Sequence, residues 1–493
     1  MKYRAEIDGL RALAVLPVIL FHAGFEWFSG GFVGVDVFFV ISGYLITTII
    51  ITEMAEGKFS IVNFYERRAR RILPALFFVM LACLPFAWLW LNPNDLRDFG
   101  ISLFAVSTFS SNILFFMEGG YFGTAAELKP LLHTWSLAIE EQYYILFPIF
   151  LMLTWRLGIK WILILLSIAF FASLGYAQLR VYNYPSATFF LLGTRGWELL
   201  VGVFAAFYLK FNTHLKSHFV NQSLSLLGFG MIVYSIVEFD ETTPFPSLYA
   251  LVPTIGTGLL ILCAVPKTFI YKLLSINFIV GIGLISYSAY LWHQPLLAFY
   301  KNVFIGRTES FVLLLLCFLS LVLAYLNWRW VETPFRRRNR FTRRQIYVFS
   351  AIGCVLFSAV GASFYLLGEE FQIKNPNIAP SSFADYRGDI DPGESSAQIS
   401  YACSNEKVRV NYIFAEFCQS KPDAKVDLAL LGDSHALHLF VGLAQGLDLN
   451  IINLWKPGWN RGAPFSEKNA YIFDYLDEPE SPEIVLISMW WNM

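Results

Sequence analysis

The chain has 493 residues, of which 56% are hydrophobic, 17% aromatic and only 15% charged. A soluble globular domain is about 25% charged, so the composition excludes an ordinary soluble protein. The net charge of −1 says nothing about partners, but the positions of the charges do. Apolar stretches recur from Leu10 to Leu367 at about the length that spans a bilayer, which indicates a polytopic α-helical membrane protein.

Twelve apolar stretches are candidate spans. Dense basic clusters in short loops mark the cytoplasmic side, and they predict the side on which each stretch ends. The stretch at 99–116 is rich in Ser, Thr and Asn and is the poorest span. Without it, about ten spans fit the charge pattern, and an eleventh at 345–367 carries the C-terminal part outside. The twelve begin near Leu10, Phe32, Ile72, Phe99, Leu137, Trp161, Ala187, Gln222, Ser247, Phe278, Glu309 and Gln345.

Ten apolar residues separate Arg11 from His22 in the first predicted span. At 100° per residue the two side chains lie on one helix face, about 16 Å apart along the axis. An ionisable group in a bilayer is costly and needs a partner or a function, and imidazole suits proton transfer near neutral pH. The alternative is structural: Arg11 anchors the helix at the cytoplasmic surface and His22 bonds a carbonyl group.

The next two spans add charged groups. Asp36 follows the glycines of GGFVGVD, and a buried Asp needs a cationic partner such as Arg or His. The segment RRARR contains Arg67, Arg68, Arg70 and Arg71, and guanidinium groups fit phosphate well. For any one of these arginines, a cluster that only stops the chain at the cytoplasmic surface is the alternative.

Two later stretches also combine apolar and ionisable residues. HTWSLAIEEQYY contains His133, Glu140 and Glu141 at the start of a span. Two adjacent carboxyl groups in a helix cannot both face lipid, so we expect one to orient a histidine and the other to form a salt bridge. SYSAYLWHQP places Tyr290 and His293 three residues apart, on one helix face.

The composition changes near residue 371. The segment at 371–425 is rich in Pro, Ser, Asp and Gly and is typical of a linker. Three short apolar runs follow (VDLALLG, LNIINLW and EIVLISMW), separated by stretches that suit helices, which predicts a parallel α/β sheet. If this part is extracytoplasmic, Cys403 and Cys418 can form a disulfide; otherwise they remain two thiols.

The segments described above resemble the membrane acyltransferase family three, bacterial proteins that move acyl groups onto extracytoplasmic glycans. The motifs occur in the family's order across about residues 5–338: Arg11-x10-His22, GGFVGVDVFFVISGYLI, FYERRARRILP, HTWSLAIEEQYY, YSAYLWHQP and WVETPFRR. The resemblance implies acetyl-CoA as the donor, no metal, and an essential Arg11/His22 pair in which His22 handles the acyl group. It also implies the inner membrane, while the basic residues Lys2 and Arg4 predict that the N-terminus lies in the cytoplasm.

Resemblance and chemistry together suggest a mechanism. The phosphates of CoA bind from the cytoplasmic side, and the pantetheine arm brings the thioester to His22. His22 acts as general base on a sugar hydroxyl, or as a transient acyl carrier, and Glu140 or Glu141 fixes its tautomer. The expected donor-binding residues are Arg11, Arg67, Arg68, Arg70 and Arg71, and the supporting residues are Asp36, His133, Tyr290 and His293. The expected acceptor is a surface glycan, first of all the lipopolysaccharide O-antigen.

The segment GDSH at 432–435 follows a predicted strand and resembles the first block of SGNH hydrolases. The resemblance implies a nucleophilic role for Ser434. The family's Asp-x-x-His base is missing, since no histidine follows His438, so we expect this part to be incomplete and inactive. The expected organisation is therefore a membrane acyltransferase domain (1–338), a linking transmembrane helix (339–370), a linker (371–425) and an incomplete SGNH-like α/β domain (426–493).

Two other functions fit parts of this pattern. A glycan or acyl exporter would use intramembrane His and Glu residues as a proton relay. It would have less need of the arginine cluster on one cytoplasmic face. A membrane scaffold with a glycan-binding tail is a third possibility, for residues 371–493 alone.

Overall fold

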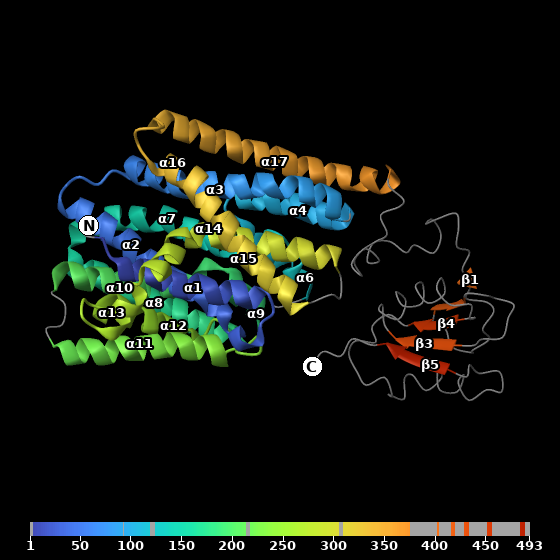
Figure 1. Ribbon diagram of the computed structural model, residues 1–493, viewed down its shortest axis with the longest axis horizontal. Coiled ribbons are helices and arrows are strands. Elements are labelled where there is room, and N and C mark those ends of the chain that lie inside the picture. The colour runs from blue at the N-terminus through green and yellow to red at the C-terminus, as the bar shows by residue number, and fades with distance from the viewer. Residues whose placement is uncertain are drawn as a thin grey trace. The chain divides into compact units, whose positions relative to one another are not determined.

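The computed structural model describes residues 3–91, 93–118, 124–212, 217–304 and 309–374, together with five strands between 402 and 488. The chain divides into two compact units, Met1–Ala379 and Pro380–Met493. The first unit is a bundle of helices and the second contains the sheet (Figure 1).

The first unit consists of long helices that lie roughly side by side, with short helices between them (Figure 1). The long helices are α1 (Ala5–His22), α2 (Gly34–Ala55), α3 (Ile61–Trp90), α7 (Thr134–Thr154), α8 (Ile159–Arg180), α10 (Leu192–Phe211), α11 (His218–Glu238), α14 (Asn277–Val303), α15 (Ser310–Asn327) and α17 (Arg343–Lys374). The shorter ones are α4 (Pro93–Ser107), α5 (Ser111–Met117), α6 (Thr124–Glu127), α9 (Pro185–Phe190), α12 (Leu251–Cys263), α13 (Phe269–Leu274) and α16 (Thr333–Arg336).

Eight helical segments of the described residues are long and apolar enough to cross a membrane. The prediction of a multi-pass α-helical membrane protein is therefore confirmed, while the number of ten spans plus a linking span stays a prediction. Three helices at predicted spans are not among the eight: α12 has only 13 residues, and α1 and α14 carry many of the polar residues singled out above. The stretch at 99–116 is divided, because α4 ends at Ser107, α5 begins at Ser111, and Phe109 between them has a φ of 53°.

The central helices touch at glycines. A Cβ atom at Gly283 of α14 would overlap the carbonyl oxygen of Asp8 in α1, and one at Gly202 of α10 would overlap that of Val40 in α2. Small residues at such contacts let the backbones of membrane helices approach closely. The helices that carry the predicted site are thus held together by direct backbone contact.

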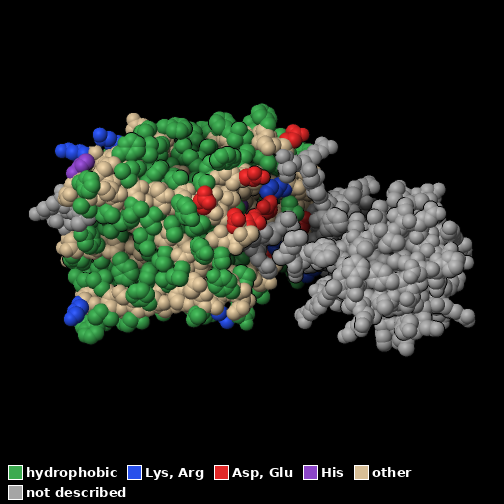
Figure 2. Space-filling view, turned by 90° about the horizontal axis from the view of Figure 1, so that it is seen from below, with side chains coloured by type: hydrophobic (Ala, Val, Ile, Leu, Met, Phe, Trp, Pro, Cys, Tyr) green, Lys and Arg blue, Asp and Glu red, His purple; other side chains and the backbone are tan. Residues whose placement is uncertain are grey.

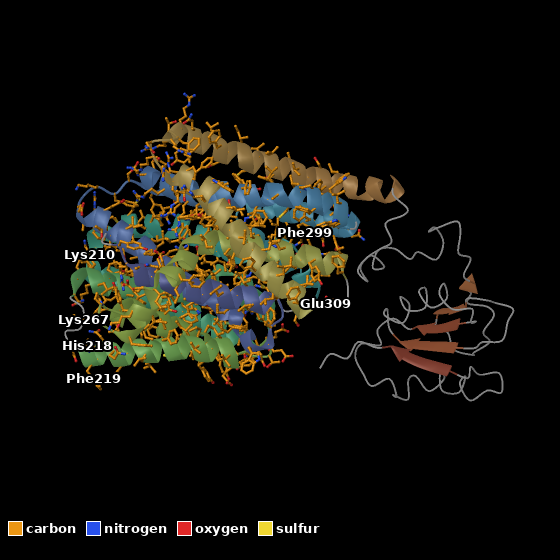
Figure 3. The ribbon with its side chains drawn as sticks, viewed as in Figure 1. Lys210, His218, Phe219, Lys267, Phe299 and Glu309 are labelled. Carbon is orange, nitrogen blue, oxygen red and sulfur yellow. The ribbon has the colours of Figure 1, made fainter. Side chains whose placement is uncertain are left out.

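Charged side chains are sorted between two ends of the bundle. Figure 3 shows Lys210, His218 and Lys267 together at one end, where α10 and α12 finish and α11 begins, with Glu309 toward the opposite end. We call these the basic end and the acidic end. On the face in Figure 2, Lys and Arg side chains lie mainly at the left edge, and Asp and Glu side chains gather toward the right. The arginines of α3, near its beginning, and those around α16 belong to the basic end.

The second unit contains a sheet in the order β1-β2-β4-β3-β5. The strands are β1 (Ala402–Cys403), β2 (Glu416–Gln419), β3 (Leu428–Gly432), β4 (Ile451–Trp455) and β5 (Ile484–Ser488). The last three lie in the predicted apolar runs and pair in parallel. β1 and β2 add antiparallel pairing at one edge. The three predicted strands are thus parallel to one another, but β1 and β2 make the sheet mixed rather than purely parallel.

Two details of the predicted domain boundaries change. α17 continues to Lys374, and β1 and β2 fall inside the expected linker at 371–425, so this segment contributes to the sheet. The antiparallel register of β1 and β2 places Cys403 opposite Cys418. Ser434, which follows shortly after β3, lies outside the described residues.

Candidate functional site

A cavity of about 100 Å³ lies within the first unit, lined by residues of α1, α2, α3, α7 and α14. Five side chains singled out in the sequence meet there: Arg11, Arg68, Arg71, Glu140 and Tyr290. Most other lining residues are apolar, with hydroxyl groups from serine and tyrosine between them. The cavity therefore joins motifs that are far apart in the chain.

Helical spacing divides the arginine cluster of α3. Residues three apart share a face, and Arg68 and Arg71 both line the cavity. Arg67 instead forms an ion pair of 3.0 Å with Glu53 at the end of α2. Arg67 therefore does not line the cavity, and its expected part in donor binding stays a prediction.

Arg70 is also used elsewhere. It is buried and forms an ion pair of 2.9 Å with Glu66. Its guanidinium group also donates to the carbonyl oxygens of Phe335, at 3.3 Å, and Phe341, at 2.7 Å. Arg343 pairs with the other oxygen of Glu66, at 2.8 Å. Arg70 therefore joins α3 to the segment around α16 and does not belong to the cavity.

The cavity end with Arg11, Arg68 and Arg71, which we call the arginine end, is rich in positive charge. The lining contains these three guanidinium groups and a single carboxyl group, that of Glu140. Arg11 keeps an ion pair of 3.2 Å with Asp8, one turn earlier in α1. Guanidinium forks in a water-poor environment are strong partners for phosphate, so this end is chemically suited to a polyanion.

Ser136 and Tyr290 line the cavity away from these arginines. Their hydroxyl groups are 2.7 Å apart, and the Tyr290 hydroxyl donates to the carbonyl oxygen of His133 at 2.9 Å. The Tyr290 ring also packs against His133 and His293, with centroids 5.3 Å apart in each case. The wall of the cavity thus leads directly to a group of histidines.

Three buried imidazoles from distant parts of the chain form this histidine cluster, which we define as His22, His133 and His293. Ring centroids are 5.1 Å apart for His22 and His293, and 5.4 Å apart for His133 and His293. Neither ring nitrogen of His133 has a hydrogen-bond partner among the described residues. The sequence predicted all three as site residues, but not that they touch.

Hydrogen-bond partners assign the tautomers of two of these rings. His293 Nδ1 lies 2.6 Å from the carbonyl oxygen of Tyr290, so it carries the proton and Nε2 carries the lone pair. His22 Nδ1 lies 3.2 Å from that Nε2 and 2.9 Å from the carbonyl oxygen of Val18, and both of these can only accept. His22 Nδ1 is therefore a donor, which leaves the basic lone pair of the neutral ring on Nε2.

This arrangement replaces the expected role of the carboxylates. We expected Glu140 or Glu141 to fix the tautomer of His22, but Val18 and His293 do so. Glu140 accepts a hydrogen bond of 2.7 Å from Tyr144, whose hydroxyl also contacts Ser42. Glu141 is buried, and its Oε1 has no partner among the described residues. The contact with a carbonyl oxygen is the one that the structural alternative for His22 predicted, and its acceptor, Val18, lies one helical turn earlier in α1.

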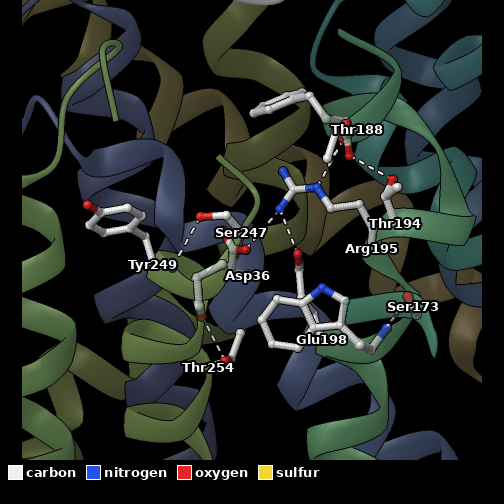
Figure 4. A network of polar contacts seen from close by, with 12 residues as sticks. Asp36, Ser173, Thr188, Thr194, Arg195, Glu198, Ser247, Tyr249 and Thr254 are labelled. Carbon is white, nitrogen blue, oxygen red and sulfur yellow. Dashed lines mark hydrogen bonds and ion pairs between the residues drawn. The ribbon is translucent and has the colours of Figure 1, made fainter. Parts of the chain in front are cut away.

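Asp36 has the cationic partner that the sequence requires, but the partner is a residue not singled out there. Arg195 Nη1 lies 2.9 Å from both Asp36 Oδ1 and Glu198 Oε1, and all three side chains are buried (Figure 4). The Arg195 guanidinium lies over the rings of Phe189 and Trp135, at 4.7 Å and 5.2 Å from their centroids. The sequence contains one signal that could have identified this partner: Arg195 and Glu198 are an Arg and a Glu three residues apart in an apolar stretch.

The acidic end covers the histidine cluster. Lys301 Nζ donates to the carbonyl oxygen of His22 at 3.1 Å and pairs with Glu127 at 2.5 Å. Gln294 donates to the carbonyl oxygens of Glu127 and Lys129, both at 3.2 Å. Burial raises the pKa of Glu241, and the charge of Glu127 raises it further.

Within the ranges described, no group of three or more His, Cys, Asp or Glu side chains is arranged to hold a metal ion.

Comparison with known proteins gives a consistent result. A family model described as "Acyltransferase domain" matches residues 4–329. The "Putative O-acetyltransferase SAS0844" of Staphylococcus aureus strain MSSA476 is 33% identical over 359 residues, which cover 69% of this chain and 58% of the relative. The O-acetyltransferase OatA of Staphylococcus aureus strain NCTC 8325 / PS 47 is 31% identical over 350 residues, with the same coverage. The chain thus spans 58% of the length of these relatives. No solved structure matches it significantly.

Proposed function

The chain belongs to the membrane acyltransferase family three, and from this premise we propose that it moves an acetyl group from cytoplasmic acetyl-CoA to a hydroxyl group of a surface glycan outside the membrane. The observation that carries the proposal is the cavity itself. It has arginines at one end, and its opposite wall contacts the histidine cluster.

Donor binding is assigned to the arginine end. We propose that Arg11, Arg68 and Arg71 hold the phosphates of CoA, which cannot enter the apolar part of the bilayer. The thioester then lies farther along the cavity, toward Ser136 and Tyr290. This assignment requires the basic end to face the cytoplasm, as the concentration of Lys and Arg there favours.

The proton chemistry is assigned to His22. Its Nε2 takes the proton of the acceptor hydroxyl as the hydroxyl oxygen attacks the thioester carbonyl. The carbon–sulfur bond then breaks, and the imidazolium returns the proton to the departing thiolate, so the products are an ester and free CoA thiol. The positive charge on the ring is stabilised meanwhile by Val18 and His293. A transient acetyl group on His22 Nε2 is the alternative path.

Acceptor binding is assigned to the acidic end, beside His22 and Lys301. The lipopolysaccharide O-antigen is the first acceptor to test, because it is the surface glycan that the family resemblance implies. The proposed membrane is the inner membrane of a bacterium, with the SGNH-like part outside. Cys labelling tests this orientation: an impermeant thiol reagent should label a single Cys introduced at position 380 in intact cells.

The test of function uses the purified 493-residue protein in lipid nanodiscs. We expect glycan-dependent release of CoA thiol from acetyl-CoA, with acetyl esters on the recovered glycan, and loss of both in His22→Ala. Proton-coupled movement of a glycan without acetyl transfer would instead favour the exporter and overturn the proposal.

A further inference from the structure

A second hollow, separate from the cavity, lies between α8, α10 and α12. It has a volume of about 540 Å³, within the range of about 300–1,000 Å³ that is usual for ligand pockets. Ser167 and Tyr208 are the only lining residues with polar side chains. We call this hollow the lateral groove. It shares no lining residue with the cavity.

Small residues create the lateral groove and aromatic rings enclose it. Ala205 and Gly258 are buried at its lining, where a Cβ on Gly258 would already come within 3.3 Å of Val201. Phe171, at 69% exposure, and Tyr208, at 39%, stand at its sides. Because α8 and α10 belong to segments able to cross the membrane, these exposed rings face lipid rather than water. The groove is thus open to an alkyl chain from the bilayer.

Three lysines lie at the basic end of the same three helices. Lys160 is in the first turn of α8, Lys210 is in the last turn of α10, and Lys267 follows the end of α12. Figure 3 shows Lys210 and Lys267 at the same end of the bundle. All three side chains are exposed, and none has an ion-pair partner among the described residues.

We propose that the lateral groove binds one anionic phospholipid of the leaflet at the basic end. An acyl chain occupies the space between α8, α10 and α12, and the phosphate lies among Lys160, Lys210 and Lys267. Charge complementarity selects an anionic headgroup over a zwitterionic one. Each lysine near the membrane surface raises the affinity for an anionic headgroup by about fivefold. This binding goes beyond the acetyl transfer and does not depend on it.

Native mass spectrometry of the 493-residue chain, released from nanodiscs of mixed phosphatidylglycerol and phosphatidylcholine, tests the proposal. We expect the wild type to retain one phosphatidylglycerol. The variant Lys160→Gln/Lys210→Gln/Lys267→Gln should lose its preference for phosphatidylglycerol by about 100-fold. The matched control Lys58→Gln/Arg338→Gln/Arg340→Gln removes the same charge elsewhere at the basic end and should keep the lipid.

A second variant tests the apolar part independently. Ser167→Phe fills the lateral groove with a ring and should abolish retention of either lipid, while an unchanged elution volume in size-exclusion chromatography shows that the protein is intact. Equal retention of both lipids by the wild type, or equal loss in the two charge variants, would overturn the proposal. Retention of a polyprenyl phosphate in place of the phospholipid would also overturn it.

Discussion

The arginine end of the cavity and the histidine cluster differ in how they are built. At the arginine end, two of the three side chains come from one turn of α3, and helical spacing alone separates Arg68 and Arg71 from Arg67 and Arg70. The histidine cluster joins α1, the residue before α7, and α14, and His22 and His293 are 271 positions apart in the chain. A binding surface can thus be local in sequence, while the site proposed for the chemistry depends on tertiary packing.

The largest loss of acetyl transfer is expected for a substitution of His22. His22→Ala should lower the rate of acetyl transfer by about 10²–10⁴-fold, the usual contribution of a general base, with the protein still inserted in the membrane. The measurement is acetyl ester formed per unit of purified protein.

His218→Ala is the matched control for His22. His218 is an exposed histidine at the basic end, at the start of α11, and its loss should leave the rate unchanged. Normal transfer by a well-expressed His22→Ala variant would remove the central role of the histidine cluster.

The next prediction compares two neighbouring arginines of α3, Arg68 and Arg67, in their effect on the KM for acetyl-CoA. Arg68→Ala should raise the KM for acetyl-CoA by about 10- to 100-fold, because a hydrogen bond to a charged group contributes about 1.5–3 kcal/mol. Arg67→Ala should leave KM nearly unchanged, since Arg67 pairs with Glu53. Equal increases of KM in the two variants would show that donor binding does not depend on the face of α3 that an arginine occupies.

His293 tests whether the cluster works as a unit. His293→Ala should lower kcat by about 10- to 100-fold at an unchanged KM, because the imidazolium of His22 loses its acceptor. His293→Gln, which offers a carbonyl oxygen, should recover part of the rate. A change in KM alone would show that His293 only shapes the cavity.

Sequence alone predicted much of this site, for reasons that the residues make plain. Arg11, His22, Asp36, His133 and His293 stood out because ionisable groups are rare in apolar helices. The separate uses of Arg67 and Arg70 were not predicted, because their partners Glu53, Phe335 and Phe341 become neighbours only in the folded bundle. His22 is oriented in part by the carbonyl group of Val18, a local contact within α1 that the structural alternative had predicted, whereas its contact with His293 depends on tertiary packing. In the second unit, strong apolar runs marked β3, β4 and β5, whereas the short β1 and β2 lie in a polar segment without such a signal.

The smallest change in acetyl transfer is expected for a substitution in the second unit, at Ser434. Ser434→Ala should leave acetyl transfer by the membrane unit unchanged, because a serine without an adjacent base is a weak nucleophile. Hydrolysis of a simple acetyl ester by residues 371–493 expressed alone should likewise be undetectable. Ester hydrolysis that depends on Ser434 in this fragment would show that a residue within 371–493 serves as its base.

The glycine contacts of the central helices have a consequence for the bilayer. Membrane helices adapt to thicker or thinner bilayers by tilting, but α14 and α1, which touch at Gly283, and α2 and α10, which touch at Gly202, have no gap in which to slide. α8, α11 and α15 expose most of their surface, so hydrophobic mismatch should be absorbed by these outer helices. The spacing of His22 and His293 would then be insulated from lipid composition, and the enzyme would keep one reaction geometry while its membrane changes in thickness.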